Sequence, residues 1–384
     1  MIARSLSPCL LGFTLSFTAL ATLERAPAAA LEKHIATIQA VGSEGAGNRA
    51  AATAFRNLAA SDSSAILPLL RAIEPSNPIA RNWLRSAVEV IVQRELSAKR
   101  ALPFAGLQAF LADKTQAPEA RRLAFELMKS IDQKKADSLI PGFLNDPSTE
   151  LRRDAVALLM TEGRTQLGRE ATEEAVTTYR QALDAARDVD QIQEIAEALT
   201  GTLKQKVDLP RHFGFLTEWQ VIGPFHNIER KGFAEVFPPE RAIDLKASYP
   251  GKEGPVRWQE LISGDRYGKV DLNKPYGKLK EVTSYAYHRF DAAQAGPAEL
   301  RLGCKNAWKI WVNGKLVFGR DEYHRGQRID QYKLPVELKQ GANTILLKLC
   351  QNEQKEDWTV QWEFQLRVCD AAGTAILATN RPTR

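Results

Sequence analysis

The stretch WKIWVNGKLVFG, residues 308–319, carries apolar side chains on alternate positions on both sides of an Asn-Gly pair. Asn-Gly at 313–314 is a strong signal for a two-residue hairpin, because a type I′ turn needs positive φ at both central residues. Alternation along the first strand puts Trp308 on one face with Ile and Val, and Trp311 on the other face with Lys309. The sequence therefore predicts a β-hairpin with Trp308 in a core and Trp311 exposed or half-exposed.

The same pattern of short apolar runs and turn residues extends through residues 216–384, which hold six of the seven tryptophans. Short apolar or alternating runs are separated there by Gly, Pro, Asn and Asp, which is typical of strands and turns. The last run, 358–368, alternates so regularly that we expect one buried and one solvated face. About ten such strands predict a β-sandwich of jelly-roll type. The runs read as strands are 218–222, 284–290, 298–302, 307–312, 315–318, 343–349 and 358–368.

Residues 31–205 have a helical period instead, with apolar positions recurring at three and four. Pro78, Pro118 and Pro147 lie 40 and 29 residues apart, and each precedes a helical stretch with an early arginine. Such intervals are typical of helical-hairpin repeats, whose apolar stripes are buried only by stacking. The sequence predicts an α-solenoid, with an irregular helical bundle as the alternative. The segment LNDPSTELRRDAVALLM, 144–160, resembles the second helix of a HEAT repeat, and 173–205 is similar to a TPR-type helical pair.

The first thirty residues have the order of a secretory signal. Arg4 precedes an apolar run at 9–23, and Pro27 then breaks the helical pattern before small residues at Ala28 and Ala30. We expect a signal peptide over 1–30, a helical-repeat domain over 31–205, a linker over 206–215 and a β-sandwich over 216–384. An uncleaved anchor is the alternative, although the run is shorter than the ~20 apolar residues of a spanning helix. We expect no transmembrane segment after cleavage, and location in the periplasm, at the cell surface or outside the cell.

The β half carries motifs of a known type. The segments EWQVIGPFHN, LRLGCKNAWKIWVNGKLVF and GANTILLKLCQNE follow one another in an order that resembles the galactose-binding-like β-sandwich. That domain is related to the sugar-binding domain of family-2 glycoside hydrolases and occurs in exported proteins of planctomycete-type bacteria. The resemblance implies a non-catalytic module that binds carbohydrate. Many relatives have an acidic turn before the hairpin, whereas this chain has CKNAW at 304–308.

Candidate ligand-binding residues come from the loops of this half. A carbohydrate site needs an aromatic ring for the apolar face of a sugar and polar side chains for its hydroxyl groups. The polar loops read equally as solvated turns or as an interface with another domain, and Trp311 as cover for a neighbouring strand. The residues that fit a carbohydrate site are Trp311, Trp358, Asp321, Tyr323, His324, Arg325, His226 and Asn227.

Several classes of function have little support. The net charge of +6 is spread among acidic residues, so we expect no nucleic-acid partner. No P-loop, HExxH or GxSxG motif is present, so we expect no enzyme.

No cysteine or histidine has the spacing of metal ligands, and we expect no cofactor. Structural calcium at Asp321, Glu322 or Asp330 is the alternative. After the signal, three cysteines remain, which allow at most one internal disulfide.

The function predicted is that of an exported, non-catalytic binding protein. A carbohydrate-binding-like sandwich is joined to a helical domain for protein–protein interaction, and the partner is a glycan or a cell-envelope protein. The main alternative is a scaffold whose two domains both contact proteins, and a hydrolase is a weaker one. An exposed Trp311 or Trp358 beside the 321–325 loop favours the first reading. A deep pocket with two facing carboxylates favours the hydrolase.

Overall fold

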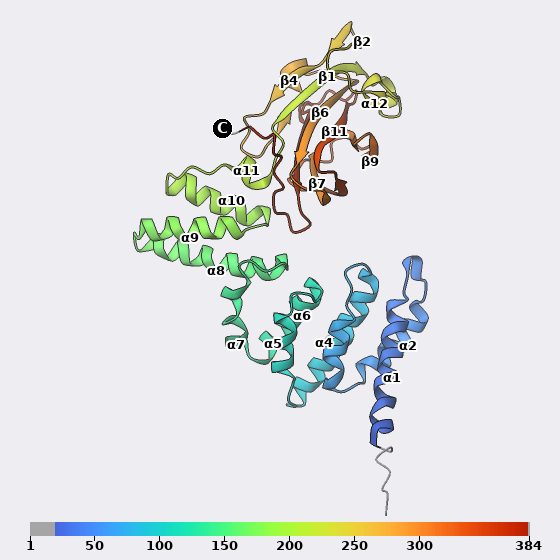
Figure 1. The fold of residues 1–384 in the computed structure, drawn as a ribbon, viewed down its shortest axis with the longest axis vertical. Helices are drawn as coiled ribbons and strands as arrows, with labels where there is room; N and C mark the ends of the chain where they lie inside the picture. Colours follow the sequence, from blue (N-terminus) through green and yellow to red (C-terminus); the bar gives the residue numbers. More distant parts are fainter. Residues whose placement is uncertain (1–19, 383–384) are drawn as a thin grey trace, which may run out of the picture. The chain divides into compact units, whose positions relative to one another are not determined.

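A computed structural model describes residues 20–382, with side chains from Ala28 onward. Helices come first and antiparallel strands follow, which confirms the predicted α-then-β order (Figure 1). Internal contacts divide the chain into two compact units that meet between Ala155 and Val156, inside helix α8 (Thr149–Gly168). This division falls earlier than the change from helix to strand near residue 206. The second unit therefore contains helices as well as both main sheets.

The first unit is helical. Its side-chain core is continuous from Ile35 to Ala155, because each helix turns its apolar stripe toward its neighbours. Helix α1 includes Pro27, where we expected a helix to break. The helices before α8 are α1 (Leu20–Gln39), α2 (Asn48–Ala59), α3 (Ile66–Arg71), α4 (Pro78–Ser97), α5 (Phe104–Ala112), α6 (Pro118–Ile131) and α7 (Gln133–Asp137), with short 3₁₀ turns at Ser43–Gly45, Ser63–Ala65 and Ile140–Phe143.

Proline begins two of these helices, as the sequence predicts. Pro78 and Pro118 occupy the first turns of α4 and α6, where a missing N–H group costs nothing. The early arginines connect neighbouring helices. Arg121 is 1% exposed and donates two hydrogen bonds to Asp146, at 2.6 and 2.7 Å. Arg152 donates to the Asp146 carbonyl oxygen at 2.9 Å, so one aspartate fixes the turn between α6 and α8.

The second unit combines helices with two antiparallel sheets. The sheets have the strand orders β4-β1-β6-β11-β8-β9 and β10-β7-β12-β5, and a separate hairpin pairs β2 with β3. The strands are β1 (Glu218–His226), β2 (Ser248–Pro250), β3 (Pro255–Arg257), β4 (Gln259–Ile262), β5 (Val270–Asp271), β6 (Val282–Ala292), β7 (Gly296–Cys304), β8 (Ala307–Val312), β9 (Lys315–Arg320), β10 (Tyr332–Leu338), β11 (Gly341–Gln351) and β12 (Glu363–Cys369). The helical elements are α9 (Thr172–Ala185), α10 (Val189–Glu197), a π turn at Ala198–Thr202, α11 (Leu209–Phe213), α12 (Pro238–Arg241) and α13 (Asn273–Tyr276), with 3₁₀ turns η5 (Ile228–Phe233) and η6 (Asp357–Thr359). Helix α11 occupies the segment we expected to be a linker.

The hairpin at 313–314 forms as predicted. Asn313 and Gly314 have φ of 52° and 77°, and β8 pairs with β9 on either side of them. Trp308 is fully buried between the two sheets, in a core to which β1, β6, β7, β8, β11 and β12 all contribute. The prediction for the core face of this strand is confirmed.

Trp311 is not exposed, so it does not present a ring to solvent and fits the alternative that it covers a neighbouring strand. The residue is 9% exposed and belongs to a second apolar cluster on the outer face of the six-stranded sheet. Phe237 and Val256, from the long connection between β1 and β4, help to cover it. Lys348 holds the β1–β4 connection against the sheet. Its buried ammonium group donates to Glu240 at 2.8 Å and to the Phe233 carbonyl oxygen at 3.2 Å.

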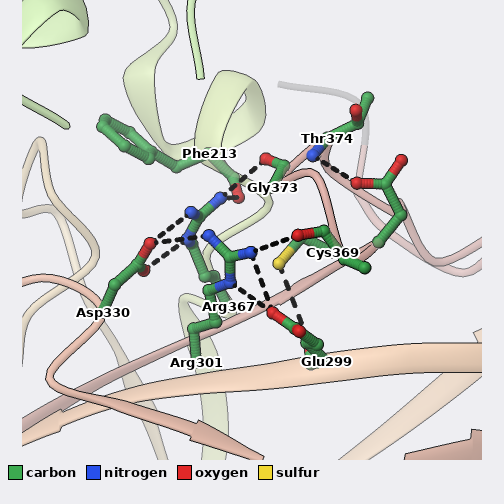
Figure 2. A network of polar contacts seen from close by, with 10 residues as sticks. Phe213, Glu299, Arg301, Asp330, Arg367, Cys369, Gly373 and Thr374 are labelled. Carbon is green, nitrogen blue, oxygen red and sulfur yellow. Dashed lines mark hydrogen bonds and ion pairs between the residues drawn. The ribbon is translucent and has the colours of Figure 1, made fainter. Parts of the chain in front are cut away.

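The polar face of β12 is buried as well, which corrects the prediction of a solvated face. Arg367 is 1% exposed, and Figure 2 shows its guanidinium group beside that of Arg301, both directed at Asp330. Arg367 also donates to the carbonyl oxygens of Phe213 in α11 and Gly373. Segments remote in sequence therefore cover the face that alternation alone would leave in water.

No helix within residues 20–382 is long and apolar enough to span a membrane. Most of the expected signal peptide, residues 1–19, lies outside the described part of the chain.

Candidate functional site

Three polar loops meet at one end of the six-stranded sheet. The antiparallel register places His226 opposite Val282, Val282 opposite Gln351, and Trp308 opposite Arg320. The carboxyl ends of β1, β11 and β9 therefore share an edge of the domain. The loops that follow them are 227–233, 352–358 and 321–325, and they contain most of the predicted site residues. We call the side chains of Asn227, Arg230, Asp321, Tyr323, His324, Asn352 and Trp358 the loop cluster.

Asn227 forms the base of the loop cluster. It is fully buried, and its amide nitrogen donates to the Tyr323 hydroxyl at 3.1 Å and to the Gln351 carbonyl oxygen at 2.9 Å. Its side-chain oxygen has no hydrogen-bond partner among the described residues. Burial raises the pKa of Tyr323, so its hydroxyl group stays protonated at neutral pH. An unpaired acceptor therefore lies below the surface of the cluster.

His324 is held firmly, although its backbone is left-handed with a φ of 57°. Its N–H group donates to the Lys305 carbonyl oxygen at 2.7 Å, and its ring Nε2 lies 2.8 Å from the side-chain oxygen of Asn352. Since that oxygen only accepts, Nε2 carries the proton and Nδ1 offers a lone pair. Burial, followed by the charges of Lys280, Lys305 and Arg230, lowers the pKa of His324, so the ring is neutral. Nδ1 has no partner among the described residues.

Trp358 provides an exposed aromatic ring. It lies on η6 and is 55% exposed, and its ring meets that of His324 edge-on with centroids 5.3 Å apart. Lys305 fixes this turn from below by donating to the Trp358 carbonyl oxygen at 2.7 Å and to Gln361 at 2.6 Å. The ring is therefore exposed on a backbone that is already ordered.

Two charged side chains, Arg230 and Asp321, also belong to the loop cluster. Arg230 pairs with Glu353 and lies over the Tyr323 ring, 5.3 Å from its centroid. Asp321 accepts no hydrogen bond from the described residues. Burial raises its pKa, while the positive charges of Arg230 and Lys309 oppose that rise. An exposed carboxylate without a donor is suited to accept hydrogen bonds from ligand hydroxyl groups.

The remaining predicted residues lie apart from this arrangement. Arg325 is exposed and lies 3.6 Å from Glu322. His226 is directed toward the β1–β4 connection, where it lies 3.3 Å from Glu235 and packs edge-on against Phe237. Trp311 is buried on the outer face of the sheet, as described above.

Arg230 and Asn352 join the loop cluster although we did not predict them as site residues. The polar run CQNE, 350–353, is the sequence signal for Asn352. Arg230 has no comparable signal, because it reaches the cluster from a turn in which Glu229 and Arg230 both have positive φ.

The arrangement offers no metal site among residues 28–382. No group of three or more His, Cys, Asp or Glu side chains in this range could hold an ion. Asp330, one of the candidate calcium ligands, uses both carboxylate oxygens to accept from Arg301 and Arg367. The three cysteines of this range are free and buried, and burial raises the pKa of Cys350 to about 11.

No protein-family model and no curated protein matches this chain. Among solved structures, an α-xylosidase of glycoside hydrolase family 31 from Xanthomonas citri is 12% identical over 41% of this chain and 16% of that chain, with a TM-score of 0.21. Two structures of the β-glucosidase from Kluyveromyces marxianus, one of them in complex with glucose, are 8% and 10% identical. Each covers 74% of this chain, and this chain covers 36% and 35% of theirs, with TM-scores of 0.26 and 0.23. The chain thus spans little more than a third of these proteins at most, and TM-scores this low carry no argument about its fold or function.

Proposed function

We propose that this protein is a non-catalytic glycan-binding protein and that the loop cluster is its binding site. The observation that carries the proposal is the exposed ring of Trp358, set edge-on to His324 where three loops converge. An exposed aromatic ring on an ordered turn, at the meeting point of three polar loops, suits a ligand with one apolar face and many hydroxyl groups.

Each group has a role in this proposal. The face of Trp358 stacks on a sugar ring. The carboxylate of Asp321 accepts hydrogen bonds from hydroxyl groups, and the ring of His324 supports Trp358 edge-on. Asn227 holds Tyr323 in place from below. Because most of these side chains are positioned by bonds within the domain, little conformational entropy is lost on binding.

The rest of the chain fits an exported binding protein. The sandwich is proposed to be a galactose-binding-like jelly roll, and the helical half a HEAT-like solenoid that contacts a cell-envelope protein. The signal-like order of residues 1–30 supports export to the periplasm or the cell surface.

The test is binding of the full-length protein to a broad panel of immobilised glycans, followed by calorimetry on the best ligand. Trp358→Ala is expected to weaken binding ~30-fold, corresponding to the ~2 kcal/mol of a central aromatic contact. Leu316→Ala is the matched control, since Leu316 is similarly exposed at 48% but lies on β9 outside the cluster. Equal affinity of the Trp358→Ala variant would refute the site. Absence of binding to every glycan would favour the scaffold alternative.

A further inference from the structure

A cavity of about 380 Å³ opens at the end of β1 that is remote from the loop cluster, at Glu218 rather than at His226. Eight residue steps along a strand separate these ends, or roughly 26 Å. The volume is within the range of small-ligand sites, ~300–1,000 Å³. The cavity is thus distinct from the loop cluster and large enough for a ligand of its own.

The walls of this cavity are already in place. Trp219 is 2% exposed and lines it from below, and the C-terminal segment 378–382 lines one side. Thr379 donates from its backbone to the Asp291 carbonyl oxygen at 2.8 Å, and Asn380 donates to the Arg289 carbonyl oxygen at 3.0 Å. The chain therefore forms the cavity without a ligand.

Several polar side chains line the cavity without using their polar atoms. Gln220, Glu260 and the hydroxyl group of Tyr287 form no hydrogen bond or ion pair with another described side chain. His288 Nδ1 lies 2.7 Å from the Glu218 carbonyl oxygen, so Nδ1 carries the proton and Nε2 keeps a lone pair. Burial lowers the pKa of His288, which keeps the ring neutral. Donors and acceptors are thus mixed around one space.

The charges of the cavity do not favour ionic ligands. Arg289 is already paired with Asp291 at 2.8 and 3.1 Å, and Arg381 donates to the Phe215 carbonyl oxygen at 2.9 Å. The lining also contains the carboxylate of Glu218, so two acidic side chains, Glu218 and Glu260, face two guanidinium groups. No excess of either charge therefore favours an anionic or a cationic ligand.

From these contacts we infer that the cavity is a second binding site and that it takes a neutral, hydroxyl-rich molecule the size of a monosaccharide. Each hydroxyl group of such a ligand both donates and accepts, as the mixed lining requires. The half-exposed ring of Tyr287 and the side chain of Leu245, which is 44% exposed, provide the apolar surface. This site does not depend on the loop cluster, so a failure of one leaves the other standing.

The experiment is NMR on the full-length protein with free D-glucose, D-galactose, D-mannose and N-acetyl-D-glucosamine, in which saturation transfer detects the bound sugar and a protein-observed spectrum follows the histidine rings. At least one sugar is expected to bind saturably and to shift the ring-proton resonance of His288, which is assigned with His288→Gln. Glu260→Gln and Tyr287→Phe keep the size of each side chain and should weaken that binding at least tenfold. Trp358→Ala should leave the affinity unchanged.

Three results would overturn the inference: no saturable binding of any of the four sugars, cavity variants that bind like the unchanged protein, or binding without a shift at His288. If binding is lost only in Trp358→Ala, the loop cluster alone is a sugar site. If a cavity variant fails to fold, the His288 ring-proton shift on addition of sugar still tests binding in the cavity, because this shift is measured in the unchanged protein.

Discussion

Asp330 is an acidic side chain shared by two buried arginines, and its neutralisation should destabilise the β half of the chain. Figure 2 shows both guanidinium groups bonded to its carboxylate. The carboxylate accepts from Arg367 at 2.7 and 2.5 Å and from Arg301 at 3.0 Å. Arg367 and Arg301 are 1% and 5% exposed. Without the carboxylate, both positive charges would remain buried, close together and poorly compensated.

The informative substitution is Asp330→Asn. Asp330 has a φ of 59°, a conformation that asparagine tolerates better than alanine, so the change tests charge and not backbone strain. Breaking a buried ion pair costs about 3–5 kcal/mol. Arg367 keeps the carbonyl oxygens of Phe213 and Gly373, and Arg301 keeps Glu299 at 2.8 Å, so we expect the lower end of this range. A loss of ~3 kcal/mol corresponds to a fall in Tm of about 6–12 °C.

The assay is urea and thermal unfolding followed by tryptophan fluorescence, which reports the β half because six of the seven tryptophans lie after residue 216. Glu322→Gln is the control, since Glu322 pairs with the partly exposed Arg320 at 2.9 Å. Surface pairs of that kind contribute at most ~1 kcal/mol. A loss of less than ~1 kcal/mol in Asp330→Asn would refute the view that this carboxylate compensates both arginines.

Two further predictions concern α11 and the hairpin. Burial, then the charge of Arg187, lowers the pKa of His212 to about 4, below the ~6.5 of an unfolded chain. The unfolded state therefore binds more protons between these values, and stability falls by about 3 kcal/mol as the pH drops from ~6.5 to ~4. Chemical denaturation at pH 7 and pH 4 should show that His212→Gln removes this part of the loss, and an identical pH dependence would contradict it. Gly314→Ala should lower the free energy of unfolding by ~1 kcal/mol in the same assay, because the backbone φ of 77° strains any residue with a Cβ. No heavy atom lies within 4 Å of the added Cβ, so no steric clash adds to this loss. A stabilised variant would exclude the type I′ turn.

Local features of this chain could be predicted from the sequence. Asn313-Gly314 determines the turn by itself, and the alternation before it places Trp308 in the core. Pro78 and Pro118 mark helix starts for an equally local reason, the missing N–H group. In each case the deciding contacts lie within a few residues of the signal.

The errors arose where a remote segment decides exposure. Trp311 looked exposed beside Lys309, yet the β1–β4 connection, with Phe237 and Val256, covers that face of the sheet. Arg367 looked solvated for the same reason, although α11 and the turn at Gly373 close over it. Alternation along a strand separates two faces, but it does not tell which neighbours cover them.

The loop cluster shows the same division. The polar loops could be picked out one at a time, but their convergence depends on the order β1-β6-β11-β8-β9, which brings three distant strand ends together. The sequence does not specify that order, and so it could not show that Asn227 meets Tyr323 or that Asn352 meets His324.

The free cysteines of the two main sheets can report on sheet opening. Cys304, Cys350 and Cys369 lie on β7, β11 and β12, with thiol pKa values raised by burial to about 12, 11 and 11. The folded sheets thus shield these sulfur atoms from alkylating reagents both sterically and by keeping them protonated. Labelling by such a reagent therefore proceeds through opened molecules, and its rate measures how often each sheet opens under native conditions. The two sheets carry separate thiols, so mass spectrometry of the labelled peptides would distinguish fraying of one sheet from the opening of both.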